Sequence, residues 1–123
     1  MKKTIIVILL FAVFALAENF NTDKGLVTIS KNKYGTEYIL RPSAPLAGIG
    51  EVKRIEMNEC GDFRNIIITY NDGTIQQYSA DGDKTPTMTI QRHDRFISWE
   101  NISSNKFAKA WRTYSMIFQG YTA

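Results

Sequence analysis

The chain has 123 residues, a formal net charge of +3 and a single cysteine, Cys60. A chain of this length suits one domain of ordinary size. One cysteine excludes an internal disulfide framework, so we expect the fold to rest on its hydrophobic core.

The first residues have the order of a secretory signal peptide. Lys2 and Lys3 precede an apolar run over residues 5–17, which ends in the small-residue pattern Ala-Leu-Ala. A cationic start, a short apolar middle and small residues before the cleavage site are typical of such a segment. We therefore predict a signal peptide at residues 1–17, whose cleavage leaves Glu18 as the first residue.

This leader predicts export rather than residence in a membrane. The apolar run has thirteen residues, whereas a helix needs ~20 to cross a bilayer. We expect a periplasmic or secreted domain, residues 18–123, without stable membrane insertion after cleavage. A buried core helix and an uncleaved signal anchor are the alternatives.

Cleavage also changes the charge of the chain. Removal of Lys2 and Lys3 lowers the formal net charge from +3 to +1. A nearly neutral chain lacks the broad positive potential that attracts phosphate backbones. We therefore expect no nucleic-acid partner.

After a polar lead-in at residues 18–25, a series of segments has the composition of β-strands. Val52–Cys60 alternates but is only partly apolar, which predicts a strand near an edge or with one solvated face. Phe63–Tyr70 contains three consecutive isoleucines, which predicts a central strand covered on both faces. The strand-like segments are Leu26–Ile29, Tyr34–Leu40, Val52–Cys60, Phe63–Tyr70, Thr74–Ser79, Thr87–Ile90 and Arg95–Trp99.

Two connections between these strands are informative. Asn71-Asp72-Gly73 separates two alternating runs, and because its glycine can take a positive φ, it predicts a hairpin turn. Pro42–Gly50 is the longest expected loop and is unusually apolar, since it carries Leu46 and Ile49. We interpret this loop as packed over the edge of the core, with a binding rim as the alternative.

The periodicity changes after Trp99. Ser103 and Ser104 are suitable N-caps, Gly120 is placed to end a helix, and apolar residues between them recur at spacings of three and four. The pattern predicts an amphipathic helix at about residues 103–119 whose aromatic side chains cover the sheet, with membrane-surface binding as the alternative. The apolar positions are Phe107, Ala110, Trp111, Tyr114, Ile117 and Phe118.

These elements predict an α+β fold. The expected architecture is an antiparallel, strongly bent sheet or small open β-barrel of six to seven strands, with the C-terminal amphipathic helix packed on it. Such a fold can present loops and a strand edge to a partner.

The residues that could carry catalysis or bind a metal form no specific motif. Cys60 and His93 carry the only thiol and the only imidazole of the chain, and their spacing in the sequence supports no particular catalytic geometry. We expect Cys60 to be a buried small apolar residue. A reactive thiol and a disulfide-linked dimer are the alternatives. The turn aspartates Asp72, Asp81 and Asp83 lack the spacing of a calcium-binding EF-hand loop. We predict no catalytic site, no metal site and no cofactor.

The interpretation that requires least special chemistry is an exported, non-enzymatic binding or inhibitory module of the bacterial envelope, encoded by a bacterium or a phage. Its partner would be a protein or another envelope component. The candidate contacts lie in the apolar loop and at the hairpin turn: Leu46, Ile49, Tyr70, Asp72 and Thr74.

Two alternatives belong to other classes. One is a small exported hydrolase that uses two carboxylates about 5–10 Å apart; the candidates are Glu51, Glu56, Asp62 and Asp94. The other is a structural subunit of a surface assembly, joined through exposed strand edges or through Cys60.

Overall fold

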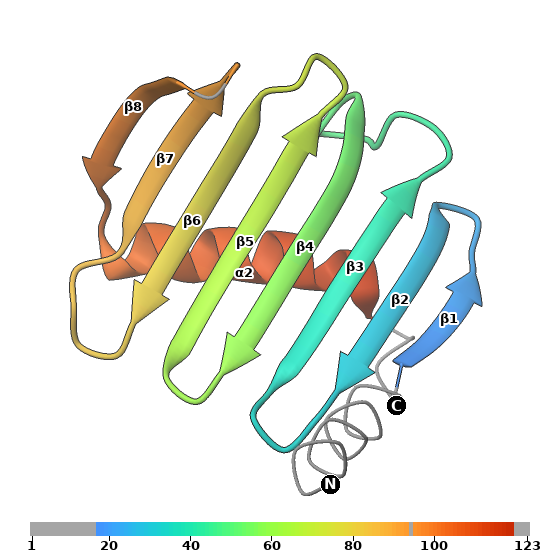
Figure 1. The fold of residues 1–123 in the computed structure, drawn as a ribbon, viewed down its shortest axis with the longest axis horizontal. Coiled ribbons are helices and arrows are strands. Elements are labelled where there is room, and N and C mark those ends of the chain that lie inside the picture. The colour runs from blue at the N-terminus through green and yellow to red at the C-terminus, as the bar shows by residue number, and fades with distance from the viewer. Residues whose placement is uncertain (1–16, 94, 120–123) are drawn as a thin grey trace, which may run out of the picture.

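The computed structural model describes residues 17–93 and 95–119, which form one open antiparallel sheet and one helix. Each strand pairs with the next along the chain, so the order in the sheet is β1 to β8. The helix lies across one face (Figure 1). The elements are β1 (Ala17–Asn21), β2 (Gly25–Lys31), β3 (Thr36–Pro42), β4 (Val52–Cys60), β5 (Phe63–Tyr70), β6 (Ile75–Asp81), β7 (Thr87–Arg92), β8 (Arg95–Asn101) and α2 (Ser104–Phe118).

The predicted α+β class is confirmed, but the strand number is corrected from six or seven to eight. The additional strand is β1, which lies where the sequence predicted a polar lead-in. Its polar residues show no apolar alternation, and the strand forms because its backbone pairs with β2. Among the described strands β1 and β8 lie at the two edges of the sheet, which does not close into a barrel.

Strand β5 occupies a central position in the sheet, as expected, but it is covered on one face only. Ile66 and Ile68 point toward α2 and are fully buried. Ile67 lies on the opposite face and is half-buried. The prediction of cover on both faces is therefore wrong, because the single described helix leaves the second face open.

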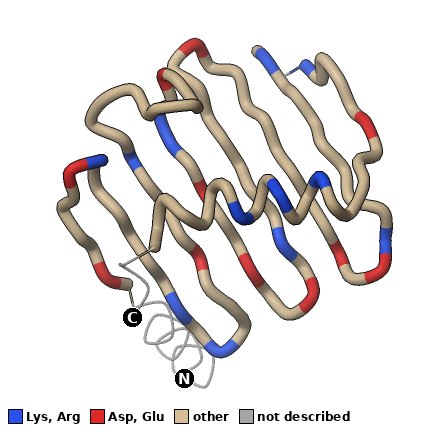
Figure 2. The backbone as a smooth tube through the Cα atoms, turned by 180° about the vertical axis from the view of Figure 1, so that it is seen from behind, with Lys and Arg blue, Asp and Glu red and all other residues tan. Residues whose placement is uncertain are grey.

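Helix α2 provides the cover for the buried face. It begins where predicted, with the hydroxyl of Ser103 accepting a hydrogen bond from the Lys106 N–H at 3.0 Å. Phe107, Ile117 and Phe118 are buried, and the ring of Phe118 lies 5.5 Å from that of Tyr38 on β3. The aromatic stripe is therefore part of the core, while basic residues follow the outer side of the helix (Figure 2).

The loop between β3 and β4 packs against the same core. Leu46 and Ile49 are partly buried against it, and a bridge between Leu46 and Gly50 closes the loop on itself. Leu46 accepts backbone hydrogen bonds from Ile49 at 3.1 Å and from Gly50 at 2.8 Å. The loop therefore has the structural role that its apolar composition suggested.

Several sequence expectations fall on residues that the structure does not describe. They are the signal peptide at residues 1–16, the turn residue Asp94 and the helix stop at Gly120. Ala17, the last residue of the predicted signal, is the first residue of β1 and pairs with Ser30. Across 17–93 and 95–119, no helix has both the length and the apolarity to span a bilayer.

The packing of α2 predicts a large cost for truncating its last buried ring. Phe118 is 2 % exposed, and Phe118→Ala should lower the free energy of unfolding by about 3–5 kcal/mol, as for other buried phenylalanines. Urea unfolding followed by circular dichroism measures this change. Met116→Ala is the control, since Met116 is 62 % exposed and should shift stability by less than about 0.5 kcal/mol. Equal stability of the two variants would contradict the packing described here.

Candidate binding surfaces

Within residues 17–93 and 95–119 no helix or strand packs on the face of the sheet opposite α2, which is the first candidate surface. Side chains of directly paired residues in neighbouring antiparallel strands lie on the same face. The register therefore places three rows of residues from β5 to β8 on this open face. We call them the neutral patch: Asn65, Ser79, Thr87 and Asn101; Ile67, Gln77, Thr89 and Trp99; and Thr69, Ile75, Gln91 and Phe96.

The neutral patch carries no ionisable side chain. Eight of its twelve residues are Asn, Gln, Ser or Thr, and the other four are two isoleucines and two aromatic residues. The same register places one charged residue of β6, Asp81, on the open face beyond the first row, since it pairs with Phe63; Asp81 forms an ion pair with Lys84 at 3.7 Å. The other charged strand residues of this face lie on β3 and β4, where Arg54 and Glu56 form an ion pair with each other. Because β1 and β2 place only uncharged residues on this face, its charge is concentrated between two uncharged regions, one of which contains the neutral patch.

Edge strand β8 is exposed along its whole length. Phe96 is 72 % exposed and Trp99 is 62 % exposed. Between them, Ile97 sits at an irregularity in the pairing with β7, where the register shifts by one residue. Large exposed apolar side chains at a free strand edge are typical of an interaction surface.

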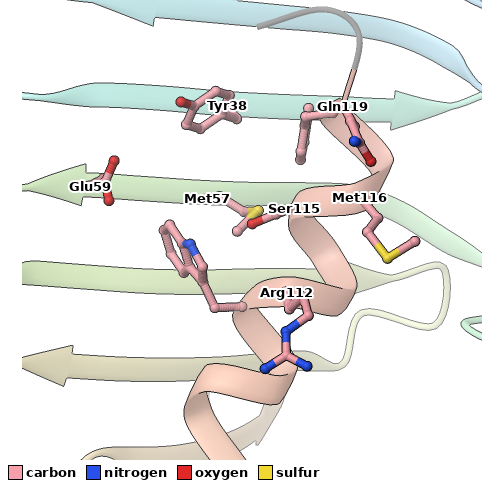
Figure 3. Close-up of a pocket in the computed structure, with 9 residues that line it drawn as sticks. Tyr38, Met57, Glu59, Arg112, Ser115, Met116 and Gln119 are labelled. Carbon is pink, nitrogen blue, oxygen red and sulfur yellow. The ribbon is translucent and has the colours of Figure 1, made fainter.

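A second candidate is a groove of about 330 Å³ between α2 and the ends of β3 and β4 (Figure 3). Tyr38, Met57 and Glu59 reach it from the sheet, and the rest of its wall comes from the last turns of the helix. The helix residues that line it are Trp111, Arg112, Ser115, Met116, Phe118 and Gln119. Its wall is mostly apolar, with polar groups at the rim.

The carboxylate of Glu59 in the wall of this groove already has an ion-pair partner. Glu59 forms an ion pair with Arg64 at 3.2 Å, and the Arg64 guanidinium lies 5.2 Å from the centre of the Trp111 ring. Burial, and then the negative charge of Glu59, raise the pKa of Tyr38. Glu59 is the one carboxylate in the wall, so the groove lacks the carboxylate pair that glycoside hydrolysis requires.

The structure brings the five contacts proposed from sequence to one end of the sheet. The Asn71 N–H donates to the Glu51 carbonyl at 3.2 Å, which joins the loop after β3 to the hairpin turn. Leu46, Ile49 and Tyr70 all pack on the core. Their apolar groups therefore stabilise the fold and are only partly available to a partner.

The two remaining contacts stabilise the turn itself. The carboxylate of Asp72 accepts a hydrogen bond from the Thr74 N–H at 2.9 Å, and the bonds to Thr74 lower the pKa of Asp72. Thr74 is 8 % exposed, and its hydroxyl accepts a hydrogen bond from Nε of Arg92 at 3.0 Å. Gly73 has φ +88°, as the three-residue hairpin loop requires.

The other residues considered for chemistry do not gather in one place. Cys60 is the last residue of β4 and His93 lies in the turn after β7, so the two residues lie at opposite ends of the sheet (Figure 1). Glu51 and Asp62 flank the nine residues of β4 and are therefore about 30 Å apart. Within residues 17–93 and 95–119 no group of His, Cys, Asp and Glu is arranged to hold a metal ion.

Asp62 does share a surface hollow with another carboxylate. The hollow has a volume of about 500 Å³ and lies between the β4–β5 and β6–β7 turns, where Asp62 and Asp83 both line it. Arg64 and Lys84 line it as well. Both aspartates are exposed.

Cys60 is exposed, so the expectation that it is buried is wrong. It lies at the last position of β4, beside the tight turn at Gly61 and Asp62, and its pairing with Phe63 places it on the face of the sheet opposite α2. A pairing of Cys60 between two chains remains a prediction.

Sequence reasoning did not identify the neutral patch. The signal is present in the chain: Thr87, Thr89 and Gln91 alternate with Met88 and Ile90, and Gln77 and Ser79 alternate with Tyr78. By itself such alternation indicates strands and does not indicate a binding surface. Which of the two alternating faces stays open depends on where α2 packs, and this contact is not visible in a local pattern.

Comparisons with protein-family models, with curated proteins and with solved structures give no match for this chain.

Buried tyrosines predict a sensitivity of the fold to alkali. Burial, and then the proximity of Tyr70 and Tyr78, raise the pKa of Tyr114 to about 12. Because this folded-state value exceeds the ordinary value of about 10, the neutral ring stabilises the fold fully below pH ~10, and that stability is lost as the pH rises toward about 12. Tyr114→Phe should therefore shift the midpoint of base-induced unfolding to higher pH, as measured by circular dichroism. Tyr34→Phe is the control, since Tyr34 is 62 % exposed; an equal shift in both variants would contradict this assignment.

The exposed thiol predicts covalent dimers in an oxidising compartment. Since Cys60 is solvent-accessible, we expect a dimer band on non-reducing electrophoresis of oxidised protein, and its loss in Cys60→Ser. A monomer band for the oxidised wild-type chain would show that two copies cannot bring their strand ends together.

Proposed function

We propose that the protein is an exported, non-enzymatic binding module of the bacterial envelope, and that its open sheet face is the binding surface. The observation that carries this proposal is the asymmetry of the sheet. Helix α2 covers one face, whereas the other displays the neutral patch with Trp99 and Phe96 at its edge. Aromatic side chains on a rigid strand provide contact area at small entropic cost.

The open face is a better candidate than the loop and turn suggested by the sequence. Leu46, Ile49 and Tyr70 are tied into the core, so a partner would have to compete with internal packing for them. Trp99 and Phe96 are mostly exposed, so a partner could contact them without competing with internal packing. Charges introduced at Leu46 and Ile49 would also perturb folding, which makes these positions poor reporters of binding.

The two alternatives from other classes make different demands on the structure. Among the described residues, a hydrolase could use Asp62 with Asp83 in the hollow they share, because Glu51 lies at the other end of β4 and Glu56 is paired with Arg54. A structural subunit would use the free edges β1 and β8. The proposal of a binding module needs neither a carboxylate pair nor a repeating contact.

The proposal is tested by export and by binding to isolated envelopes. We expect mass spectrometry of the exported chain to give Glu18 as the first residue, and the purified chain to sediment with envelopes of the producing bacterium. Trp99→Ala should reduce the bound fraction about tenfold, as expected for a central aromatic contact. Circular dichroism checks that the variant is folded.

Tyr34→Ala is the matched control, because Tyr34 is an aromatic residue as exposed as Trp99 but lies in the turn between β2 and β3. It should bind as the wild type does. Full-length chain in the cytosol with Met1 attached would contradict export. Equal sedimentation of wild type and Trp99→Ala would contradict the open face as the binding surface.

A further inference from the structure

The neutral patch has a chemistry that narrows the class of partner. Its polar side chains are all amides or hydroxyls, so each can donate as well as accept hydrogen bonds. An anionic ligand would find no cation among its twelve residues, and a cationic ligand would find no carboxylate. The complementary ligand is therefore an uncharged molecule rich in hydrogen-bonding groups.

Some of these polar groups are held in place by their neighbours. The Gln77 amide donates to the Ser79 hydroxyl at 3.1 Å. The side-chain oxygen Oδ1 of Asn65 accepts a hydrogen bond from the side-chain amide of Asn58 on β4 at 2.8 Å. Each bond uses one donor or one acceptor of its amide, so further capacity remains for a ligand. Side chains fixed in this way lose less conformational entropy when they bind.

The aromatic edge supplies the second component. The face of an indole ring carries partial negative charge, and it attracts the weakly positive C–H groups on the flat side of a sugar ring. Trp99 is 62 % exposed and pairs with Thr89 of the middle row. A ring on this edge therefore lies beside hydroxyl and amide groups, which is the combination that a sugar needs.

The shape of the patch favours an extended chain over a compact ligand. Neighbouring strands lie ~4.8 Å apart and alternate residues of a strand ~7 Å apart, so four strands and three rows extend about 14 Å in each direction. Neither the groove beside α2 nor the hollow between the turns includes a residue of the neutral patch. An exposed surface of this size accommodates several units of an extended polymer.

From the neutrality, the polar rows and the exposed aromatic edge together, we propose that the neutral patch binds an uncharged, extended glycan without cleaving it. This inference rests on the proposed function and adds the chemical class of the partner. Because the ligand is neutral, its affinity should not depend on ionic strength, in contrast to the binding of a charged polymer.

The experiment titrates the exported chain with two uncharged hexasaccharides, cello-hexaose and chito-hexaose, in a calorimeter at low and at high salt. We expect one or both to bind with the same affinity at both salt concentrations, and polygalacturonate, an anionic chain, not to bind. Trp99→Ala should weaken binding at least tenfold. Thr89→Glu, which places a charge in the centre of the patch, should abolish it, while Tyr34→Ala should bind as the wild type does.

Three outcomes would overturn the inference. The first is that neither hexasaccharide binds; if Trp99→Ala still loses envelope binding, only the glycan is wrong and the binding module remains. The second is a dimer at low concentration by light scattering that Trp99→Glu converts to monomers, because a second copy would then cover the patch. The third is release of new reducing ends from a hexasaccharide, abolished in Asp62→Asn, which would favour the hydrolase alternative.

Discussion

The structure depends on the packing of helix α2 against one face of the sheet. A single antiparallel sheet exposes two faces to water, and its apolar face is stable only when another element covers it. Here the rings of Phe107 and Phe118 and the side chain of Ile117 provide this cover from the end of the chain. The helix has 15 residues, which at ~1.5 Å each is long enough to cross four to five strands.

This arrangement makes the two ends of the chain interdependent. Phe118 contacts Tyr38 of β3, and Ser103 begins the helix directly after β8. The helix therefore returns across the sheet toward the strands that come first in the sequence. The apolar residues of β2 to β5 are covered only when the last segment of the chain is in place, so the domain should fold as one cooperative unit rather than strand by strand.

The sequence predicts best what depends on neighbours along the chain. The turn at Asn71, Asp72 and Gly73 and the cap at Ser103 are both found as expected, because a few adjacent residues determine each. It predicts poorly what depends on distant contacts. Strand β1 forms through pairing with β2 rather than through its own pattern, and the exposure of Cys60 depends on which face of the sheet the helix covers, since its pairing with Phe63 places it on the other face.

The same limitation applies to the candidate site. Leu46 and Ile49 are candidate contacts in the sequence because apolar residues in a loop are unusual. The structure accounts for them by packing against the core. Trp99 did not stand out, because an aromatic residue in a strand is ordinary. It became informative only when the strand was found at an edge with its ring 62 % exposed.

The uncharged composition of the neutral patch is not required by folding. A solvated sheet face is tolerant of charge, and charged side chains there protect a free edge from aggregation. The strands β3 and β4 carry Glu37, Arg41, Arg54 and Glu56 on this face, whereas the twelve residues of the neutral patch carry no charge. Lys or Glu at Thr89 or Gln77 would cost the fold little, but binding of the proposed uncharged partner would have to desolvate such a charge. The proposed binding surface therefore lies on the face opposite α2, because packing already accounts for the face under the helix.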